Sequence, residues 1–343
     1  MAALRVVKSM KNQRLKYVDF YKFLGITLMI MGHVGFGSGF DKYIHAFHMP
    51  MFFVASGYCF SSGRCFGSFA LKRSRSILIP YFVFSIITFL ALRRINDIRF
   101  SSLQHIVWLN NVGTPIAGVW FLTALLWSNL IYFAINRIPS DNIRWFTSIV
   151  CFLLGATIES TIGTTLPWSI AQALVGVFFI HIGKCQREKE QLKNVPTWIV
   201  ISGIVIVTGL VFLNNHVNVR LSKYDNIALF LINAVAMSVL LLVLSTRVEK
   251  KVENLRVYDV LCSIGHNSIC YLVLNQIVIR HSSAILENDI FHAWGGVKPV
   301  IVFLISYVTM YLLSAIITNT RLRTLVGDFT GIKICGKRNE DRV

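Results

Sequence analysis

The amino-acid sequence predicts an all-α, polytopic membrane protein with about ten transmembrane helices and with both termini in the cytoplasm. Of its 343 residues, 55% are hydrophobic and only 15% are charged, and the mean hydropathy is +0.61. Soluble globular chains are about one-quarter charged, so this composition is typical of a membrane protein. The apolar residues also gather into runs of about 20, the length of helix that spans the hydrocarbon core of a bilayer.

Ten apolar segments follow one another along the chain, and polar loops separate them. Their approximate ranges are 17–36, 44–61, 76–92, 116–136, 144–160, 167–184, 197–214, 226–245, 259–280 and 298–319. No loop between them is long enough for a soluble domain. Residues 1–343 are therefore predicted to form a single membrane-embedded domain.

The distribution of Lys and Arg predicts the orientation of these helices. With a cytoplasmic N-terminus, the cytoplasmic segments hold 25 of the 34 Lys and Arg residues, the outside loops hold 8, and Lys22 lies within the first helix. Cytoplasmic loops of membrane proteins are enriched in these two residue types. The basic segments 1–16 and 320–343 are therefore predicted to be cytoplasmic, and the net charge of +18 indicates topology rather than a nucleic-acid partner.

The first predicted helix carries ionisable residues, which hydrocarbon disfavours. Asp19 and Lys22 are three residues apart, so they share one helix face and can pair. Lys22 and His33 are eleven residues apart, which places them on one stripe about 16 Å apart along the axis. Ionisable groups at membrane depth generally face a bundle interior or a cavity and are often functional. The alternative is that Lys22 extends to the inner interface beside Asp19 and that His33 is an interfacial histidine.

The second segment opens with His45 and His48, which also share one helix face. Histidine has an unperturbed pKa near neutrality, so it can take a proton from a hydroxyl group. A metal site is the alternative, but no carboxylate or cysteine ligand pattern accompanies these histidines, and no metal is expected. Five other histidines lie in or near predicted loops and are interpreted as incidental: His105, His181, His216, His266 and His292.

Several motifs together resemble the acyltransferase-3 family of integral membrane acyltransferases. Asp19, Lys22 and His33 resemble the family's first helix, in which an Arg or Lys precedes a His by about ten residues. The other matching stretches are FHMPMFFVASGY at 47–58, LKRSRSILIPYFVF at 71–84, GVWFLTALL at 118–126 and SIGHNSICYLVLNQ at 263–276. The closest likeness is to the fucose 4-O-acetylase-like branch. One departure is Asn275, which stands where many relatives place a late histidine.

The resemblance implies that an acyl group, usually acetyl from cytoplasmic acetyl-CoA, is transferred to a sugar hydroxyl of a cell-surface or lipid-linked glycan. Its partners would be the acyl-CoA, the saccharide acceptor and the bilayer of a cell membrane, here a bacterial cytoplasmic membrane. Asp19 would hold Lys22, and Lys22 would contact the donor or polarise its thioester. Lys72, Arg73 and Arg75 would bind the phosphates of CoA, although the positive-inside rule alone also predicts a basic loop there.

On the acceptor side, the resemblance implies that His33 is the general base, or a transient acyl carrier in a two-step variant. His48 would be a second base or a hydrogen-bond partner, and His45 would contact the acceptor. Trp120 would stack on a sugar face, although a tryptophan at this depth is also a common interfacial anchor. The rival interpretation is a transporter or flippase of glycan intermediates. Clustering of the polar groups in the first two segments favours the enzyme, because transporters with inverted repeats place their broken helices in both halves.

Overall fold

The computed structural model describes residues 14–61, 63, 65–92, 106–108, 119–189, 195–286 and 296–329. In these residues the regular structure is helical, apart from an isolated β-bridge between Asn218 and Lys223. The α-helices are α2 (Lys16–Val34), α3 (Ser38–His45), α4 (His48–Tyr58), α5 (Phe66–Leu92), α7 (Trp120–Ile135), α8 (Asp141–Ile162), α9 (Ile170–Lys189), α10 (Thr197–Val211), α11 (Ile227–Val252), α12 (Arg256–His266), α13 (Ser268–Ile285) and α14 (Lys298–Asn319). Short 3-10 turns are η3 (Pro167–Ser169), η4 (Val219–Leu221) and η6 (Arg321–Val326).

Each of the ten predicted apolar segments contains helix, so the predicted all-α class is confirmed for the described residues. Five helical segments are long and apolar enough to cross a membrane, and they contain α5, α8, α9, α11 and α14. A sixth results if α12 and α13, which bend by 75° at their junction, are taken together. The length and apolar character of these helices indicate a multi-pass membrane protein. The count of ten spans and the cytoplasmic location of the termini stay predictions.

Three boundaries differ from those predicted from the sequence. The segment 44–61 is divided between α3 and α4, and the 11 residues of α4 rise only about 16 Å, too little to cross a hydrocarbon core of about 30 Å. The segment 259–280 is divided at the bend between α12 and α13. Helix α5 begins at Phe66, so the predicted basic loop is helical, since Leu, Lys and Arg are good helix formers.

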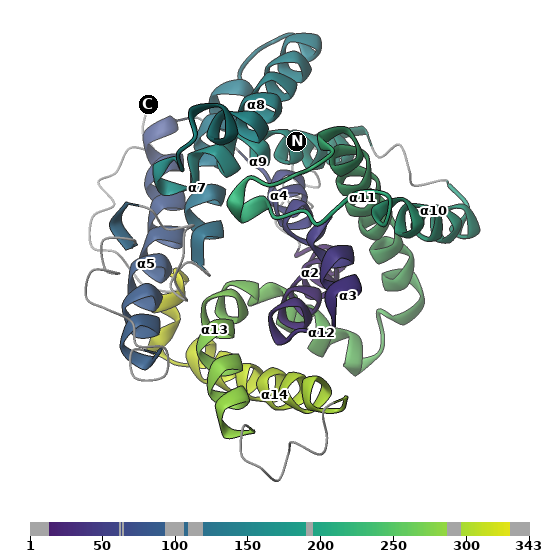
Figure 1. The fold of residues 1–343 in the computed structure, drawn as a ribbon. Helices are drawn as coiled ribbons and strands as arrows, with labels where there is room; N and C mark the ends of the chain where they lie inside the picture. Colours follow the sequence, from purple (N-terminus) through teal and green to yellow (C-terminus); the bar gives the residue numbers. More distant parts are fainter. Residues whose placement is uncertain are drawn as a thin grey trace, which may run out of the picture.

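The helices differ in how much of their surface the rest of the protein covers. Figure 1 shows α2, α3 and α12 near the middle of the view and α5, α8, α10 and α14 around its edge. Helix α9 is mostly buried, whereas α8 and α14 are largely exposed. The exposed positions of these two outer helices include large apolar side chains, among them Ile143, Phe146, Leu153, Leu304, Val308 and Leu312. Such apolar faces suit contact with lipid.

Glycines allow the central helices to approach one another at backbone distance. A Cβ placed on Gly57 of α4 would lie 2.0 Å from the carbonyl oxygen of Ile180 in α9, and one on Gly183 would lie 2.1 Å from that of Val54. In the same way, a Cβ on Gly265 of α12 would lie 1.7 Å from the carbonyl oxygen of Asp19 in α2. These contacts fix α4 against α9 and α12 against α2, and α2 carries the candidate site.

Candidate active site

The Asp19 carboxylate is the centre of a polar cluster at the N-terminal end of α2. It is buried, and its Oδ1 lies 2.8 Å from Nζ of Lys22, as the spacing of three residues predicts. Its Oδ2 accepts a hydrogen bond of 2.6 Å from Nε of Arg14 and lies 3.7 Å from Nδ1 of His266. Arg14 also donates to the carbonyl oxygen of Cys262, so this cluster joins α2 to α12.

Further cations gather at this end of α2, around the C-terminus of α4. Lys22, Arg73 and Arg187 all interact electrostatically with the Cys59 thiol. The Arg187 guanidinium lies 5.4 Å from the ring centre of Tyr58, whose hydroxyl is 2.8 Å from that of Tyr17. Side chains from α2, α4, α5 and α9 therefore gather around Tyr58 and Cys59 at the C-terminus of α4.

The other two basic residues predicted for the donor are exposed on the first turns of α5. Lys72 and Arg75 project from this helix, whereas Arg73 is half-buried with its guanidinium 5.7 Å from the ring centre of Phe69. Of these three cations, Arg73 is thus the one with packed surroundings.

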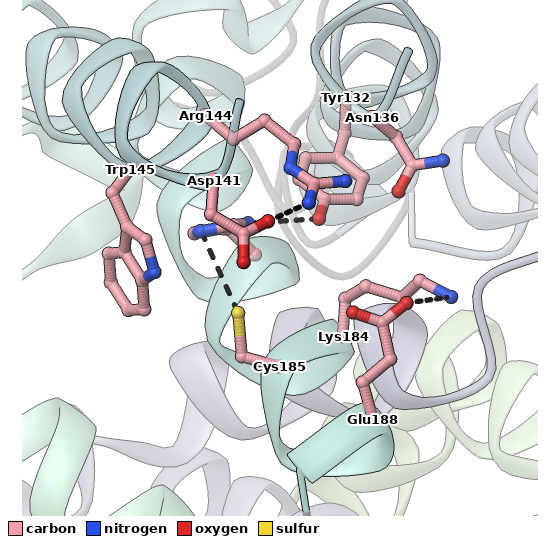
Figure 2. A pocket seen from close by; sticks show the side chains of 9 residues that line it. Tyr132, Asn136, Asp141, Arg144, Trp145, Lys184, Cys185 and Glu188 are labelled. Carbon is pink, nitrogen blue, oxygen red and sulfur yellow. Dashed lines mark hydrogen bonds and ion pairs between the residues drawn. The ribbon is translucent and has the colours of Figure 1, made fainter. Parts of the chain in front are cut away.

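A small polar pocket lies nearby between α7, α8 and α9 (Figure 2). Its cations are already paired, Arg144 with Asp141 and Lys184 with Glu188 at 3.0 Å. His181, which also lines the pocket, has its Nδ1 3.0 Å from the Tyr132 hydroxyl. In this pocket the side chains of both cations are therefore engaged by neighbouring carboxylates.

At its other end, α2 terminates beside the histidines. Gly35 ends the helix in the left-handed region with φ 89°, where its amide donates to the carbonyl of Met31. The chain turns there into α3 and packs so closely that a Cβ on Gly32 would lie 2.7 Å from Cδ1 of Ile44, with Cε1 of His45 at 3.9 Å. His33 is exposed, and it interacts electrostatically with His45 and His48.

Hydrogen bonds to backbone carbonyls determine which ring nitrogen of His45 and of His48 carries the proton when the ring is neutral. Nδ1 of His48 lies 2.7 Å from the carbonyl oxygen of Ile44, and Nδ1 of His45 lies 2.8 Å from that of Asp41. A carbonyl oxygen only accepts, so each Nδ1 carries the proton and each Nε2 is the basic nitrogen. The two rings are 5.0 Å apart between their centres.

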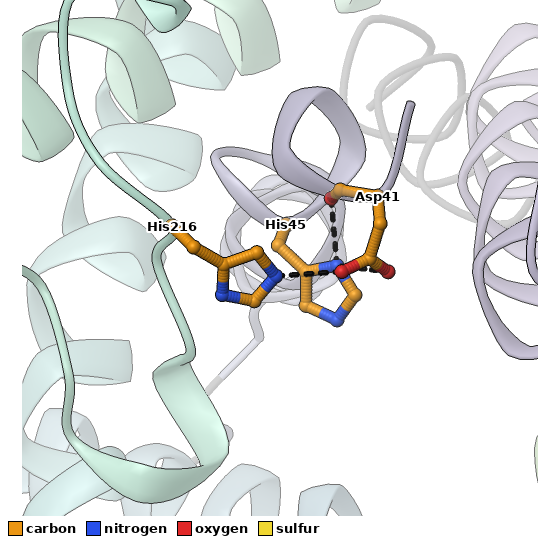
Figure 3. Close-up of side chains that lie close together, drawn as sticks. All are labelled: Asp41, His45 and His216. Carbon is orange, nitrogen blue, oxygen red and sulfur yellow. Dashed lines mark hydrogen bonds and ion pairs between the residues drawn. The ribbon is translucent and has the colours of Figure 1, made fainter. Parts of the chain in front are cut away.

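Asp41 and His216 complete this cluster, and the sequence indicates neither of them as a site residue. Oδ1 of Asp41 lies 3.1 Å from Nδ1 of His45, and Oδ2 lies 2.6 Å from Nε2 of His216 (Figure 3). His216 comes from the loop between α10 and α11, so its interpretation as an incidental loop histidine overlooks these contacts. The spacing of four residues between Asp41 and His45 is a helical signal, but it falls in a glycine-rich stretch that resembles a loop.

The structure thus brings most of the predicted site residues to one end or the other of α2. His33, His45 and His48 meet at its C-terminal end, and Asp19 and Lys22 pair at its N-terminal end. Trp120 lies at the start of α7 with its side chain buried, packed beside Phe121 rather than open to a ligand. Asn275, in place of the late histidine, is buried in α13 and donates to the carbonyl of Leu272. His105 and His292 lie outside the described residues.

A protein-family model for the acyltransferase-3 family, described as an acyltransferase domain, matches residues 15–319. Comparison with the curated proteins and with the solved structures gave no match. The matched range covers nearly all of the chain, including Asp19, Lys22, the histidines at the other end of α2 and all the apolar helices. The chain therefore belongs to the acyltransferase-3 family and is a multi-pass membrane acyltransferase.

Proposed function

We propose that the protein is an O-acetyltransferase of the cell membrane that transfers acetyl from cytoplasmic acetyl-CoA to a sugar hydroxyl of a cell-surface or lipid-linked glycan. One observation carries this proposal: α2 has a buried carboxylate–lysine pair at one end and a group of histidines at the other. The two ends are about 16 Å apart along the helix, about half the thickness of the hydrocarbon core. The sugar and the acetyl group are inferred from the motifs that resemble fucose 4-O-acetylases.

The Asp19 end is the proposed donor side. Its cations are Lys22 and Arg73, with Lys72 and Arg75 exposed on the same helix as Arg73. Phosphate groups of CoA bind such cations through charge-assisted hydrogen bonds. Asp19 holds Lys22 in place, because its Oδ1 accepts from Nζ and its Oδ2 is bound by Arg14. This side faces the cytoplasm in the orientation that the Lys and Arg distribution predicts.

The His33 end is the proposed acceptor side. Within the described residues, no hydrogen-bond partner occupies the exposed ring of His33, so a substrate hydroxyl has access to it. His33 accepts the hydroxyl proton while the hydroxyl oxygen attacks the thioester carbonyl carbon. The carbon–sulfur bond then breaks, CoA leaves as the thiolate and takes up a proton, and the sugar keeps the acetyl ester. His45 and His48, whose Nδ1 atoms donate to the backbone carbonyls of Asp41 and Ile44, shape this side of the site.

The test is mass spectrometry of cell-surface glycans from cells that express the wild type, no protein, His33→Gln or His281→Gln. His281 is the matched control, because it is an exposed helical histidine whose Nδ1 donates to the carbonyl of Ile277. Loss of a general base lowers the rate about a hundredfold or more, so early acetyl incorporation should fall to background in His33→Gln and stay normal in His281→Gln. Full acetylation by a normally expressed His33→Gln protein would refute the role of His33. Glycans unchanged on deletion would refute the proposed function.

A further inference from the structure

We propose that Asp41, His45 and His216 form a Zn²⁺ site that lies beside the proposed acceptor side and fastens the loop between α10 and α11 onto α3. Each residue offers one ligand atom, and these three atoms lie within 4.8 Å of one another. Figure 3 shows the imidazole rings of His45 and His216 next to each other, with dashed lines joining each ring to the carboxylate of Asp41. The ring centres of His45 and His216 are 5.0 Å apart. One metal ion between these three side chains would contact all of them after small side-chain rotations.

The types of ligand atom in this site favour Zn²⁺ over Ca²⁺ and Mg²⁺. Two imidazoles and one carboxylate are ligands that Zn²⁺ takes at about 2.0–2.2 Å, commonly with a fourth position left to water. Ca²⁺ and Mg²⁺ prefer sites made of oxygen ligands, so a site with two nitrogen ligands disfavours them. The side chains of all three residues are partly exposed, which gives an ion access from solvent.

The backbone holds the three ligands near one another without a metal. Asp41 and His45 are one helical turn apart on α3. The loop that carries His216 is ordered by the buried amide of Asn214, which donates to the carbonyls of Tyr224 and Asn226 and accepts from the amide of Asn226. A second link between the loop and α3 is the hydrogen bond of 3.1 Å from Lys42 to the carbonyl of Phe212. Binding of an ion therefore requires little additional ordering of the chain.

The existing hydrogen bonds are compatible with ligation. Oδ1 of Asp41 already contacts Nδ1 of His45, and Oδ2 contacts Nε2 of His216, so the carboxylate points toward both rings. If the metal binds Nδ1 of His45, the ring proton moves to Nε2 and the hydrogen bond to the Asp41 carbonyl is replaced by a metal–nitrogen bond. Nearby positive charge opposes the ion, because Arg220 acts electrostatically on His45. The affinity measured by titration decides whether the ligands outweigh this repulsion.

The experiment is isothermal titration of Zn²⁺ into the full chain, purified in detergent with its affinity tag removed and stripped of metal by a chelator. The wild type should bind one ion, and Ca²⁺ should not compete. His216→Gln and Asp41→Asn should each weaken the Kd at least about tenfold, while His281→Gln keeps the wild-type value. The visible absorption of Co²⁺ bound in place of Zn²⁺ should disappear in the same two variants.

Because the side chain of His216 is half exposed on a loop, its replacement leaves the core packing unchanged, and this variant decides the test if Asp41→Asn fails to fold. Equal Zn²⁺ affinity in His216→Gln and the wild type would overturn the proposal. So would the absence of Zn²⁺ binding to the wild type, or equal losses in His216→Gln and His281→Gln. None of these results depends on acetyl transfer, so the proposed function is tested separately.

Discussion

Replacing Gly265 by Ala should separate α12 from α2 and destabilise the protein. The new Cβ would lie 1.7 Å from the carbonyl oxygen of Asp19 and 2.7 Å from the amide nitrogen of Phe23, whereas real Cβ contacts are essentially never shorter than 3.0 Å. Both neighbours are backbone atoms, so no side chain can rotate away and the helices themselves must move. Overpacking of this kind costs about 1–3 kcal/mol, and we expect the upper end because backbone must move.

The higher helix propensity of Ala offsets part of this loss of stability. Ala is favoured over Gly by about 1 kcal/mol within a helix, so the net loss in the free energy of unfolding should be about 2 kcal/mol. Gly209 is the matched control, since it is also helical but a Cβ added to it would meet nothing within 4 Å. Gly209→Ala should therefore leave the stability unchanged or raise it by up to about 1 kcal/mol.

The assay is equilibrium unfolding of both variants in mixed micelles, followed by acetyl incorporation at a temperature where both are folded. Because α12 supplies Cys262 and His266 to the cluster around Asp19, Gly265→Ala should also slow the reaction, and Gly209→Ala should not. If Gly265→Ala is as stable as the wild type or Gly209→Ala, then the close contact between α12 and α2 is not as tight as described.

Two further predictions concern charge and topology. Asp19→Asn removes a buried carboxylate from Lys22 and Arg14 and should cost about 1–3 kcal/mol of unfolding free energy, less than for a fully buried pair because Arg14 is half exposed. Asp259→Asn breaks an exposed pair with Lys16 and should change the unfolding free energy far less. Equal losses in the two variants would contradict the difference in burial. Hydrogen bonds from the backbone amides of Ser68 and Gly67 lower the pKa of the exposed Cys65 thiol, so a variant that keeps Cys65 as its single cysteine should react with a membrane-impermeant maleimide faster than an ordinary exposed thiol near neutral pH. This labelling should occur in inside-out vesicles and not in intact cells, and labelling of intact cells would reverse the proposed orientation.

Features that depend on residues close together in the chain follow from the sequence alone. Runs of apolar residues predict helices because a helix satisfies its own backbone hydrogen bonds in hydrocarbon, and each predicted run contains helix. The spacing of Asp19 and Lys22 predicts an ion pair because residues three apart share a helix face, and the pair forms at 2.8 Å. Apolar length does not reveal that two of the runs are interrupted, because a bent pair of helices has the same hydropathy as a single helix.

Contacts between distant residues depend instead on how the helices pack. His216 reaches Asp41 across 175 positions of sequence, and His266 approaches Asp19 only because Gly265 lets α12 lie against the backbone of α2. Trp120 has the residue type of a sugar platform, but packing beside Phe121 buries its ring. Helical periodicity assigns a side chain to a face of its own helix, and only the packing of helices determines what that face contacts.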